Sequence, residues 1–399
     1  MWEETVNIHT VSEIRCKTLN YMGVGAIAKI DEISANLKKQ GVSKILVVTG
    51  KGAYKKTGAW DFVEKAFKKH AIEYVLYSDV TPNPEADEVD AAVKLGKSIG
   101  AQAVLGIGGG SPIDAAKSAA ILLAYPDKNT RDLYEFRFNP TKAVPIVAIN
   151  LTHGTGTEVN RFAVVTIPEK EFKPAIAYDC IYPAYSIDDP ALMTGLSADQ
   201  TRFVSIDAVN HVVEAATSTA ATPYSILLAR ETIRLVVKYL PMAEKDPKDL
   251  TARYFLTYAS MLAGIAFDNG LLHFTHALEH PLSGVKSNVT HGLGLALLLP
   301  AVVKQIYPAK GKVLAEILEP MVPGLTGAAD EGKQAADGIR AWLEKSKVPA
   351  GLKSLGFTEA DVEKLANLAM TTPSLGLLLS LAPVDSGKPA IEAIYRESL

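Results

Sequence analysis

The periodicity of apolar residues changes near residue 190, and this change limits the possible fold more than any other feature of the sequence. Before it, short apolar and β-branched runs alternate with helical segments, a pattern typical of a parallel sheet covered by helices on both faces. Beyond the turn Asp188-Asp-Pro190 the period stays near 3.6 and strand patterns disappear. We therefore predict a Rossmann-like α/β domain at residues 1–190 and an all-helical domain at residues 191–399.

The positions of the elements follow from the same periods. Strands are expected at residues 44–49, 73–77, 103–107, 144–149, 162–166 and 185–187, with intervening helices at residues 61–70 and 86–99. In the second half, helices are expected at residues 198–217, 223–239, 250–267, 270–282, 292–307 and 334–345.

The charge balance and the cysteine count exclude several classes of protein. A net charge of -3 lacks the basic excess that binding to nucleic acid or to an anionic membrane requires. Two cysteines, Cys16 and Cys180, are too few for a disulfide framework and suit a reducing compartment. The first residues lack a signal-peptide pattern, and the longest apolar run, residues 293–303, is too short to span a bilayer. We expect a cytoplasmic protein without nucleic-acid or membrane partners.

Three consecutive glycines follow the strand expected at residues 103–107 and open a helix. Gly108, Gly109 and Gly110 lack side chains, so their backbone amides can approach a ligand closely. Ser111 is expected to be the N-cap, and Asp114 to complete a capping arrangement. Because exposed amides at a helix N-terminus attract anions, a pyrophosphate group fits this turn. The alternative is an ordinary tight turn, but three glycines exceed what such a turn needs.

A second loop with hydroxyl groups and glycines follows the strand expected at residues 144–149. It contains Thr152, Thr155 and Thr157, which we expect to line the same ligand. The carboxyl ends of strands in an open parallel sheet form the edge where ligands bind. The composition of this loop alone would be weak evidence for ligand binding. Its position at the carboxyl end of a strand strengthens that evidence.

Histidines at helical spacing indicate a metal site in the second half of the chain. His276, His280 and His291 lie within sixteen residues, although the chain has only eight histidines. Asp207 and His211 are also four residues apart, on a helix face that is otherwise apolar. A carboxylate there is costly unless it is paired or bound to a metal. One oxygen and three nitrogens, from Asp207, His211, His276 and His291, would suit Fe(II) or Zn(II) better than magnesium or calcium. Helix capping and simple ion pairs are the alternatives.

Together these motifs resemble the iron-dependent (group III) alcohol dehydrogenase family over nearly the whole chain. The resemblance implies a dehydroquinate synthase-like fold of two domains, with substrate and metal in the cleft between them. It implies that Asp207, His211, His276 and His291 hold the metal, and that His280 lies beside the substrate without being a ligand. The motifs are Tyr21-Met-Gly-Val-Gly25, Pro82-Asn-Pro84, the run at 108–114, Gly154-Thr-Gly-Thr-Glu158, Asp207-Ala-Val-Asn-His211, and His276-Ala-Leu-Glu-His280-Pro-Leu with His291-Gly292.

The function that this resemblance implies is a metal-dependent, NAD(P)-linked alcohol dehydrogenase or aldehyde reductase. Hydride would pass between a nicotinamide coenzyme and an alkoxide or aldehyde bound to Fe(2+), with Zn(2+) as the other candidate metal. His280 is the expected proton relay, and Lys173 is included in the expected coenzyme-binding set. A small alcohol or aldehyde is the expected partner, and we expect a homodimer or higher homo-oligomer. A glycerol or polyol dehydrogenase and a hydroxyacid–oxoacid transhydrogenase of the same superfamily stay open as alternatives.

Two departures from the family pattern bear on the coenzyme. Leu151 and His153 stand where the family usually has a threonine and an alanine, so we expect His153 to affect the nicotinamide or substrate pocket. Gly50 stands about where NAD-preferring relatives have an aspartate, and residues 51–56 contain three lysines and no acid. A carboxylate there would bind the ribose of NAD and repel a 2′-phosphate. The sequence therefore favours NADP(H) over NAD(H).

Overall fold

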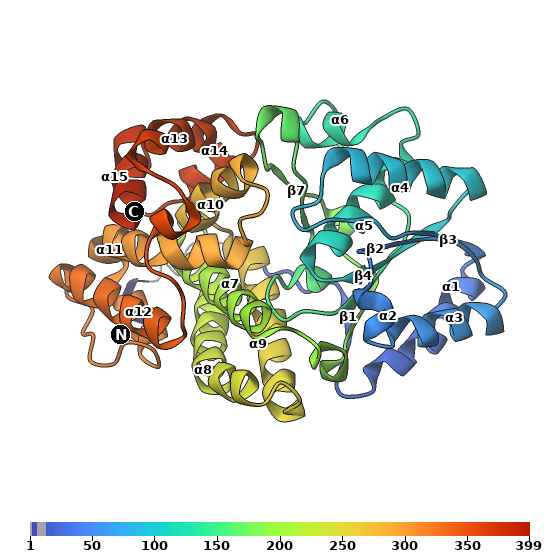
Figure 1. The fold of residues 1–399 in the computed structure, drawn as a ribbon, viewed down its shortest axis with the longest axis horizontal. Helices are drawn as coiled ribbons and strands as arrows, with labels where there is room; N and C mark the ends of the chain where they lie inside the picture. The colour runs from blue at the N-terminus through green and yellow to red at the C-terminus, as the bar shows by residue number, and fades with distance from the viewer. Residues whose placement is uncertain (1, 6–12) are drawn as a thin grey trace.

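The computed structural model describes residues 2–5 and 13–399, and it consists of a unit built on a sheet beside a unit built only of helices (Figure 1). All neighbouring strands of the six-stranded sheet are parallel, in the order β1-β8-β5-β4-β2-β3. Its strands are β1 (Leu19–Met22), β2 (Lys44–Thr49), β3 (Glu73–Tyr77), β4 (Ala103–Gly108), β5 (Ile146–Asn150) and β8 (Tyr185–Asp188), and β6 (Phe162–Val164) pairs separately with β7 (Ala175–Ala177).

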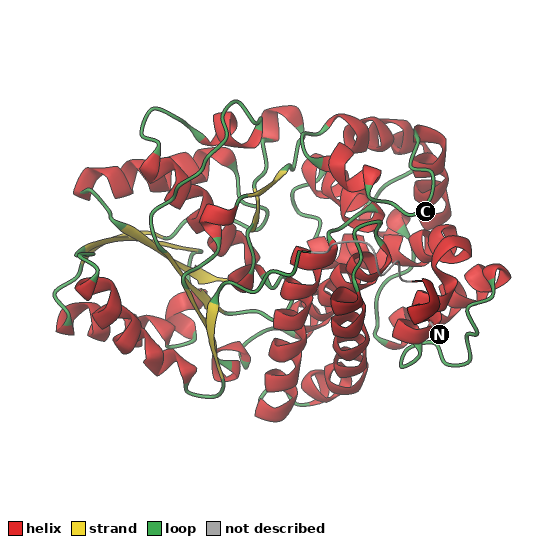
Figure 2. Cartoon of the chain, turned by 180° about the vertical axis from the view of Figure 1, so that it is seen from behind, coloured by secondary structure: helices red, strands yellow, loops and turns green. Residues whose placement is uncertain are grey.

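Helices cover both faces of the sheet because successive strand residues point to opposite sides (Figure 2). On β2, Ile45 and Val47 enter the apolar core that contains α1 and α3. Leu46 and Val48 enter the core of the other face, with α4 and α5. These helices are α1 (Ile30–Lys39), α3 (Ala59–Lys69), α4 (Ala86–Ile99) and α5 (Gly110–Ala124), and the short helices α2 (Ala53–Lys56) and α6 (Thr130–Tyr134) belong to the same unit.

The helical unit packs around one apolar core, and α11 runs through it with most of its residues buried. By length and composition α11 could cross a membrane, but 72% of its most apolar window is buried inside the protein, which is the position of a core helix. The helices are α7 (Ala198–Thr217), α8 (Pro223–Lys245), α9 (Leu250–Gly270), α10 (Phe274–Val285), α11 (His291–Leu318), α12 (Gly332–Lys345), α13 (Val362–Thr371), α14 (Leu375–Ser380) and α15 (Lys388–Ser398).

The α/β-then-helical fold class is confirmed, and one predicted helix is wrong at its start. The helix expected at residues 270–282 begins only at Phe274, because α9 continues to Gly270. Leu271 then adopts φ 61° and ψ 171°, which no helix contains. The two helices meet at an angle of 108° across this break. Helix α10 then meets the sheet unit in its C-terminal half, where Nδ1 of His280 is hydrogen-bonded to the carbonyl of Lys173 and Oγ of Ser283 accepts from Nζ of Lys173.

Candidate metal and coenzyme site

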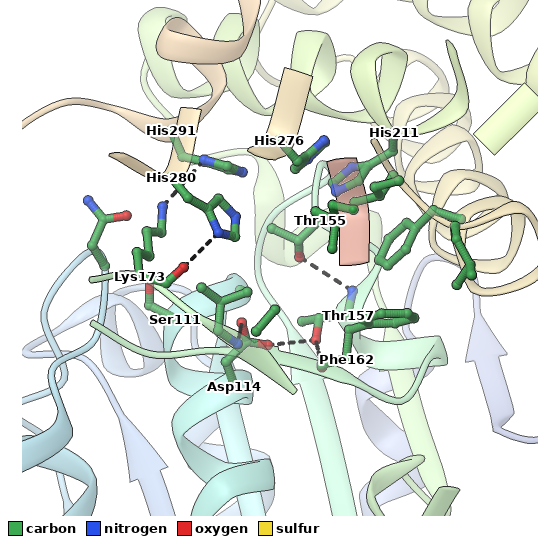
Figure 3. A pocket seen from close by; sticks show the side chains of 18 of the residues that line it. Ser111, Asp114, Thr155, Thr157, Phe162, Lys173, His211, His276, His280 and His291 are labelled. Atoms are coloured by element: carbon green, nitrogen blue, oxygen red, sulfur yellow. Dashed lines mark hydrogen bonds between the residues drawn. The ribbon is translucent and has the colours of Figure 1, made fainter. Parts of the chain in front are cut away.

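A cavity of about 200 Å³ lies between the two units. In Figure 3, four histidines project into it from the helical unit, opposite loops of the sheet unit. Polar and titratable groups from both units therefore meet in one place. They are Asn83, Ser111, Asp114, Thr155, Thr157, Lys173, His211, His276, His280 and His291.

Three of the segments expected to bind the coenzyme follow neighbouring strands. Gly50 follows β2, Gly108 ends β4, and Thr152 lies two residues beyond the end of β5. In the sheet, β2 pairs with β4 and β4 pairs with β5. The three segments thus share one edge of the sheet, the edge at which open parallel sheets bind their ligands.

The glycine run allows the two loops at this edge to pack closely. A Cβ on Gly109 would stand 2.9 Å from Oγ1 and Cγ2 of Thr152, and a Cβ on Gly110 would stand 2.7 Å from Cγ2 of Thr155. Gly110 and Ser111 form the start of α5 and line the cavity. The amides of this first turn carry the partial positive charge of a helix N-terminus, so they can hold an anionic group there.

The capping expected at the start of α5 is wrong in two respects. The N-cap is Gly109, and Ser111 lies within the first turn. The carboxylate of Asp114 caps nothing, because it accepts hydrogen bonds from Oγ1 of Thr157 at 2.7 Å and from the backbone N–H of Val164 at 3.0 Å. Burial raises the pKa of Asp114 to about 6. Asp114 therefore joins α5 to the second loop and to β6.

The four expected metal ligands come from three helices, and three of them form one compact group. Asp207 and His211 lie on α7, His276 on α10, and His291 is the first residue of α11. Oδ1 of Asp207 is 3.3 Å from Nδ1 of His211, 3.8 Å from Nε2 of His276 and 3.9 Å from Nε2 of His291. Ligand atoms of Asp207, His276 and His291 all lie within 4.8 Å of one another. His211 stands at the edge of this group, with its ring stacked on His276 at a centroid distance of 4.4 Å.

Three atoms of these four ligands have no hydrogen-bond partner among the described residues. They are Oδ1 of Asp207, Nδ1 of His211 and Nε2 of His276, and all three side chains are buried. Buried polar atoms almost always have partners, because each one left unpaired is costly. A cation would satisfy all three at once. The residues present therefore fit a metal ion, and their nitrogen-rich donor set suits iron or zinc.

Two buried carboxylates fix the orientation of two of these imidazoles. Nδ1 of His276 is hydrogen-bonded to Glu214, and Nδ1 of His291 to Glu279. Because an ionised carboxylate only accepts, each Nδ1 carries a hydrogen, which leaves Nε2 as the nitrogen that can give a lone pair to a metal in the cavity. Sequence reasoning missed Glu214, which lies one helical turn beyond His211 on α7 and 62 positions from His276. In the sequence, Glu214 could have been recognised as a further acidic residue on an apolar helix that already carried Asp207.

The buried groups around these ligands carry more negative than positive charge, and a cation would correct this imbalance. Burial opposes the ionisation of Asp207 and Glu214, but nearby histidines lower the pKa of each carboxyl to about 2. Burial also opposes a charge on His276, yet Glu214 and Asp207 raise its pKa to about 9. Glu279 is a third buried carboxylate, and a divalent cation that displaced the extra proton of His276 would share this negative charge with the ammonium of Lys173. A divalent cation would neutralise this set.

A second group of possible ligands, Glu279, His280 and His291, is also compact but fits a cation less well. Oε2 of Glu279 is already bonded to His291 and lies 3.4 Å from Nζ of Lys173. A cation bound there would face that ammonium directly. Among the described residues, no lysine or arginine forms an ion pair with the carboxylate of the first group, Asp207.

The ammonium of Lys173 is bonded among the side chains of α10 and α11. Its Nζ donates to Oγ of Ser283 at 2.9 Å and stands 3.4 Å from Nδ1 of His291. Its backbone carbonyl accepts a hydrogen bond from Nδ1 of His280 at 2.7 Å. Since a carbonyl only accepts, Nδ1 of His280 carries the hydrogen and Nε2 is the acceptor. A role of Lys173 in coenzyme binding stays a prediction.

His153 does not line the cavity, and its expected effect on the nicotinamide or substrate pocket stays a prediction. Its Nε2 accepts from Nη1 of Arg253 at 2.9 Å, and its Nδ1 lies 3.3 Å from Oγ of Ser205. Burial and the adjacent guanidinium lower the pKa of His153 to about 3, so the ring is neutral and can accept. The residue is absent from the lining of the cavity. It ties the second loop to α7 and α9.

Comparison with known proteins places these features among alcohol dehydrogenases. The family model "Iron-containing alcohol dehydrogenase" matches residues 19–190, and the model of the C-terminal part of the Fe-containing family matches residues 202–399. A long-chain primary alcohol dehydrogenase of Thermoanaerobacter ethanolicus is 58% identical over 100% of both chains. A 1,3-propanediol dehydrogenase of Klebsiella pneumoniae is 34% identical over 95% of this chain and 97% of its own. The structure of an NADH-dependent butanol dehydrogenase from Thermotoga maritima superposes with a TM-score of 0.89 at 28% identity, covering 96% of this chain and 97% of that one.

Loss of His276 or of the carboxylate behind it should weaken metal binding to different degrees. Glu214→Gln keeps the shape but removes the charge that orients His276, and we expect metal affinity to fall by about 10- to 100-fold. His276→Ala removes a donor and should cost more. Bound iron and zinc per chain, measured by elemental analysis after dialysis against a weak chelator, test both. His273→Ala is the matched control, because Nε2 of this buried histidine faces Oγ1 of Thr217. Full metal content in His276→Ala would remove His276 from the ligands.

Proposed function

This chain belongs to the iron-containing alcohol dehydrogenase family and is an oxidoreductase acting on CH–OH groups, and we propose that its substrates are primary alcohols with long alkyl chains. The observation that carries the proposal is the apolar end of the cavity. Side chains of α9, of the break between α9 and α10, of α14 with the residue that follows it, and of the sheet unit extend from the histidines as an apolar wall. They are Phe162, Val164, Ala175, Phe267, Leu271, Leu272, Leu377, Leu378 and Leu381.

The apolar wall begins at the proposed metal ligands. The ring of Phe267 stacks on His211 at 4.5 Å and packs against Phe162 at 5.2 Å. At the far end, Leu377 is 64% exposed, so the wall reaches the protein surface. An alkyl chain whose hydroxyl lay at the histidines would therefore remain in apolar contact as it lengthened. The relative that is 58% identical is named for long-chain primary alcohols, which supports the same substrate class.

In the proposed mechanism, Asp207, His211, His276 and His291 hold the metal ion, with iron favoured by the family. When bound, such an ion polarises the oxygen of the alcohol or aldehyde and lowers the pKa of the hydroxyl. Glu214 keeps the lone pair of His276 directed at the site, and Glu279 does the same for His291. The apolar wall excludes water from the reacting carbon, which favours hydride transfer to the coenzyme over exchange with solvent.

We assign the coenzyme to the carboxyl edge of the sheet. The amides of Gly109, Gly110 and Ser111 would hold the pyrophosphate, and the hydroxyls of Thr155 and Thr157 lie beside that turn on the cavity wall. Gly50, at the end of the neighbouring strand, would face the adenosine ribose. The lysines after it are exposed, so they are free to meet a 2′-phosphate. These features support a preference for NADP(H).

His280 is the proposed proton relay. It lines the cavity with the ligands, and its Nδ1 is held by the carbonyl of Lys173. Burial and the ammonium of Lys173 lower the pKa of His280 well below its ordinary value. The ring is therefore neutral, and Nε2 can accept a proton from the substrate hydroxyl.

The substrate proposal predicts a rising chain-length series. Each methylene that enters the apolar wall gains about 0.8 kcal/mol, so kcat/KM for linear primary alcohols should rise about fourfold per carbon until the wall is filled. The series uses linear primary alcohols from ethanol to decanol, and reduction of the coenzyme is monitored by absorbance. A chelator should abolish activity, and Fe(II) or Zn(II) should restore it. Higher efficiency with glycerol than with any linear alcohol would contradict the proposal.

Replacing His280 with alanine should slow turnover while the metal stays bound. Loss of a positioned proton acceptor costs about 100-fold or more in kcat. The pH dependence of kcat should also lose the contribution that comes from protonation of His280. Metal content and the melting temperature are measured alongside, so that a structural defect is recognised. An unchanged rate across the pH range, with full metal content, would show that His280 only packs.

The coenzyme assignment predicts that Gly50→Asp lowers kcat/KM with NADP(H) by about tenfold or more, because a nearby like charge is worth at least about 1.4 kcal/mol in a partly shielded site. A Cβ at this position would stand 3.2 Å from the carbonyl oxygen of Val80, so some strain accompanies any side chain. Gly50→Ala measures that strain separately. A wild type that clearly prefers NAD(H), or equal effects of the two variants, would contradict the assignment.

A further inference from the structure

A second cavity, of about 290 Å³, lies directly behind the alcohol pocket. Leu271 is the only described residue that lines both cavities. The second cavity is polar where the first is apolar. Besides Leu271, its lining includes Glu13, Arg15, Arg161, Thr222, Asp268 and Asn269.

The wall between the cavities is about one residue thick. Phe162 and Phe267 line the alcohol pocket, and their chain neighbours Arg161 and Asp268 line the second cavity. In the second cavity these two neighbours form an ion pair, with Nε of Arg161 3.2 Å from Oδ1 of Asp268. Leu271 completes the wall at the bend between α9 and α10. Leu271 is therefore the position at which a smaller side chain would bring the two cavities closest to joining.

Leu271 occupies this position in a backbone conformation that suits glycine. Its φ of 61° and ψ of 171° lie in a region that residues with a side chain rarely adopt. The conformation is held from both sides, since the amide of Leu271 donates to the carbonyl of Phe267 at 2.8 Å, and a Cβ on Gly270 would stand 2.1 Å from the carbonyl oxygen of Ala215. The fold thus keeps an isobutyl group where a glycine would be less strained, and strain of this kind gathers at functional sites.

We infer that Leu271 determines specificity by closing the apolar pocket against the polar cavity, so that alcohols with one hydroxyl group are preferred over α,ω-diols of the same length. This inference rests on the proposed function. At the chain length that brings it to Leu271, the distal hydroxyl of a diol would be buried against leucine without a partner. With the wall open, the same hydroxyl would reach the polar groups around Arg15 and Asn269. The alkyl end of a simple alcohol gains nothing there.

The experiment compares kcat/KM for 1-hexanol with 1,6-hexanediol, and for 1-octanol with 1,8-octanediol, in the wild type, Leu271→Gly and Leu271→Ala. We expect the preference for the simple alcohol to fall by about tenfold or more in Leu271→Gly at one or both lengths, since an unpaired buried hydroxyl costs on that order. Leu271→Ala should shift the preference in the same direction by less. It also serves as the second variant if the glycine protein does not fold.

Leu378→Ala is the matched control, because it enlarges the alcohol pocket at a residue absent from the lining of the second cavity. It should change kcat/KM for both members of each substrate pair in parallel.

As a readout independent of turnover, Leu271→Gly should melt no lower than Leu271→Ala, because glycine relieves the positive φ. An unchanged preference in active Leu271 variants, or an equal shift in Leu378→Ala, would overturn the inference. Absence of wild-type activity on both alcohols would instead overturn the proposed function together with the inference.

Discussion

The site depends on two buried hydrogen bonds between carboxylates and imidazoles. Glu214 holds His276 and Glu279 holds His291, and each bond determines which ring nitrogen faces the cavity. Without them the imidazoles could rotate or change tautomer, and the lone pairs would no longer converge. The same carboxylates leave an excess of buried negative charge that a divalent cation offsets. Placing these acids in a core of helices is costly, so the arrangement is stable only as a complete set.

The division of the chain into two units explains how one cavity serves two ligands. The parallel sheet brings its glycine-bearing turns to a single edge, where backbone amides and helix α5 can receive an anionic coenzyme. The helical unit supplies the imidazoles from α7, α10 and α11. The bend of 108° between α9 and α10 places Leu271 in the lining of the pocket, and α10 contacts the sheet unit through His280 and Lys173. Hydride transfer needs both ligands in contact, which this arrangement allows.

Local patterns were enough to predict much of the fold and the candidate residues. The helices at residues 86–99 and 198–217 begin and end where expected, and the spacing of Asp207 and His211 singled them out. What escaped prediction depends on contacts between distant segments. Glu214 gains its role from a histidine 62 positions away, and Lys173 faces a glutamate 106 positions away. The break at Leu271 contradicts the helical period of its own sequence and is held in place by packing against α7.

The central claim is that Asp207, His211, His276 and His291 bind one metal ion. Anomalous X-ray diffraction from crystals of the metal-loaded protein, recorded on both sides of the iron and zinc absorption edges, tests it most directly. The account predicts one strong peak per chain, at about 2.0–2.3 Å from a carboxylate oxygen of Asp207 and one nitrogen of each histidine. A peak beside Glu279 and His280, or none between the two units in protein that contains metal and is active, would contradict it.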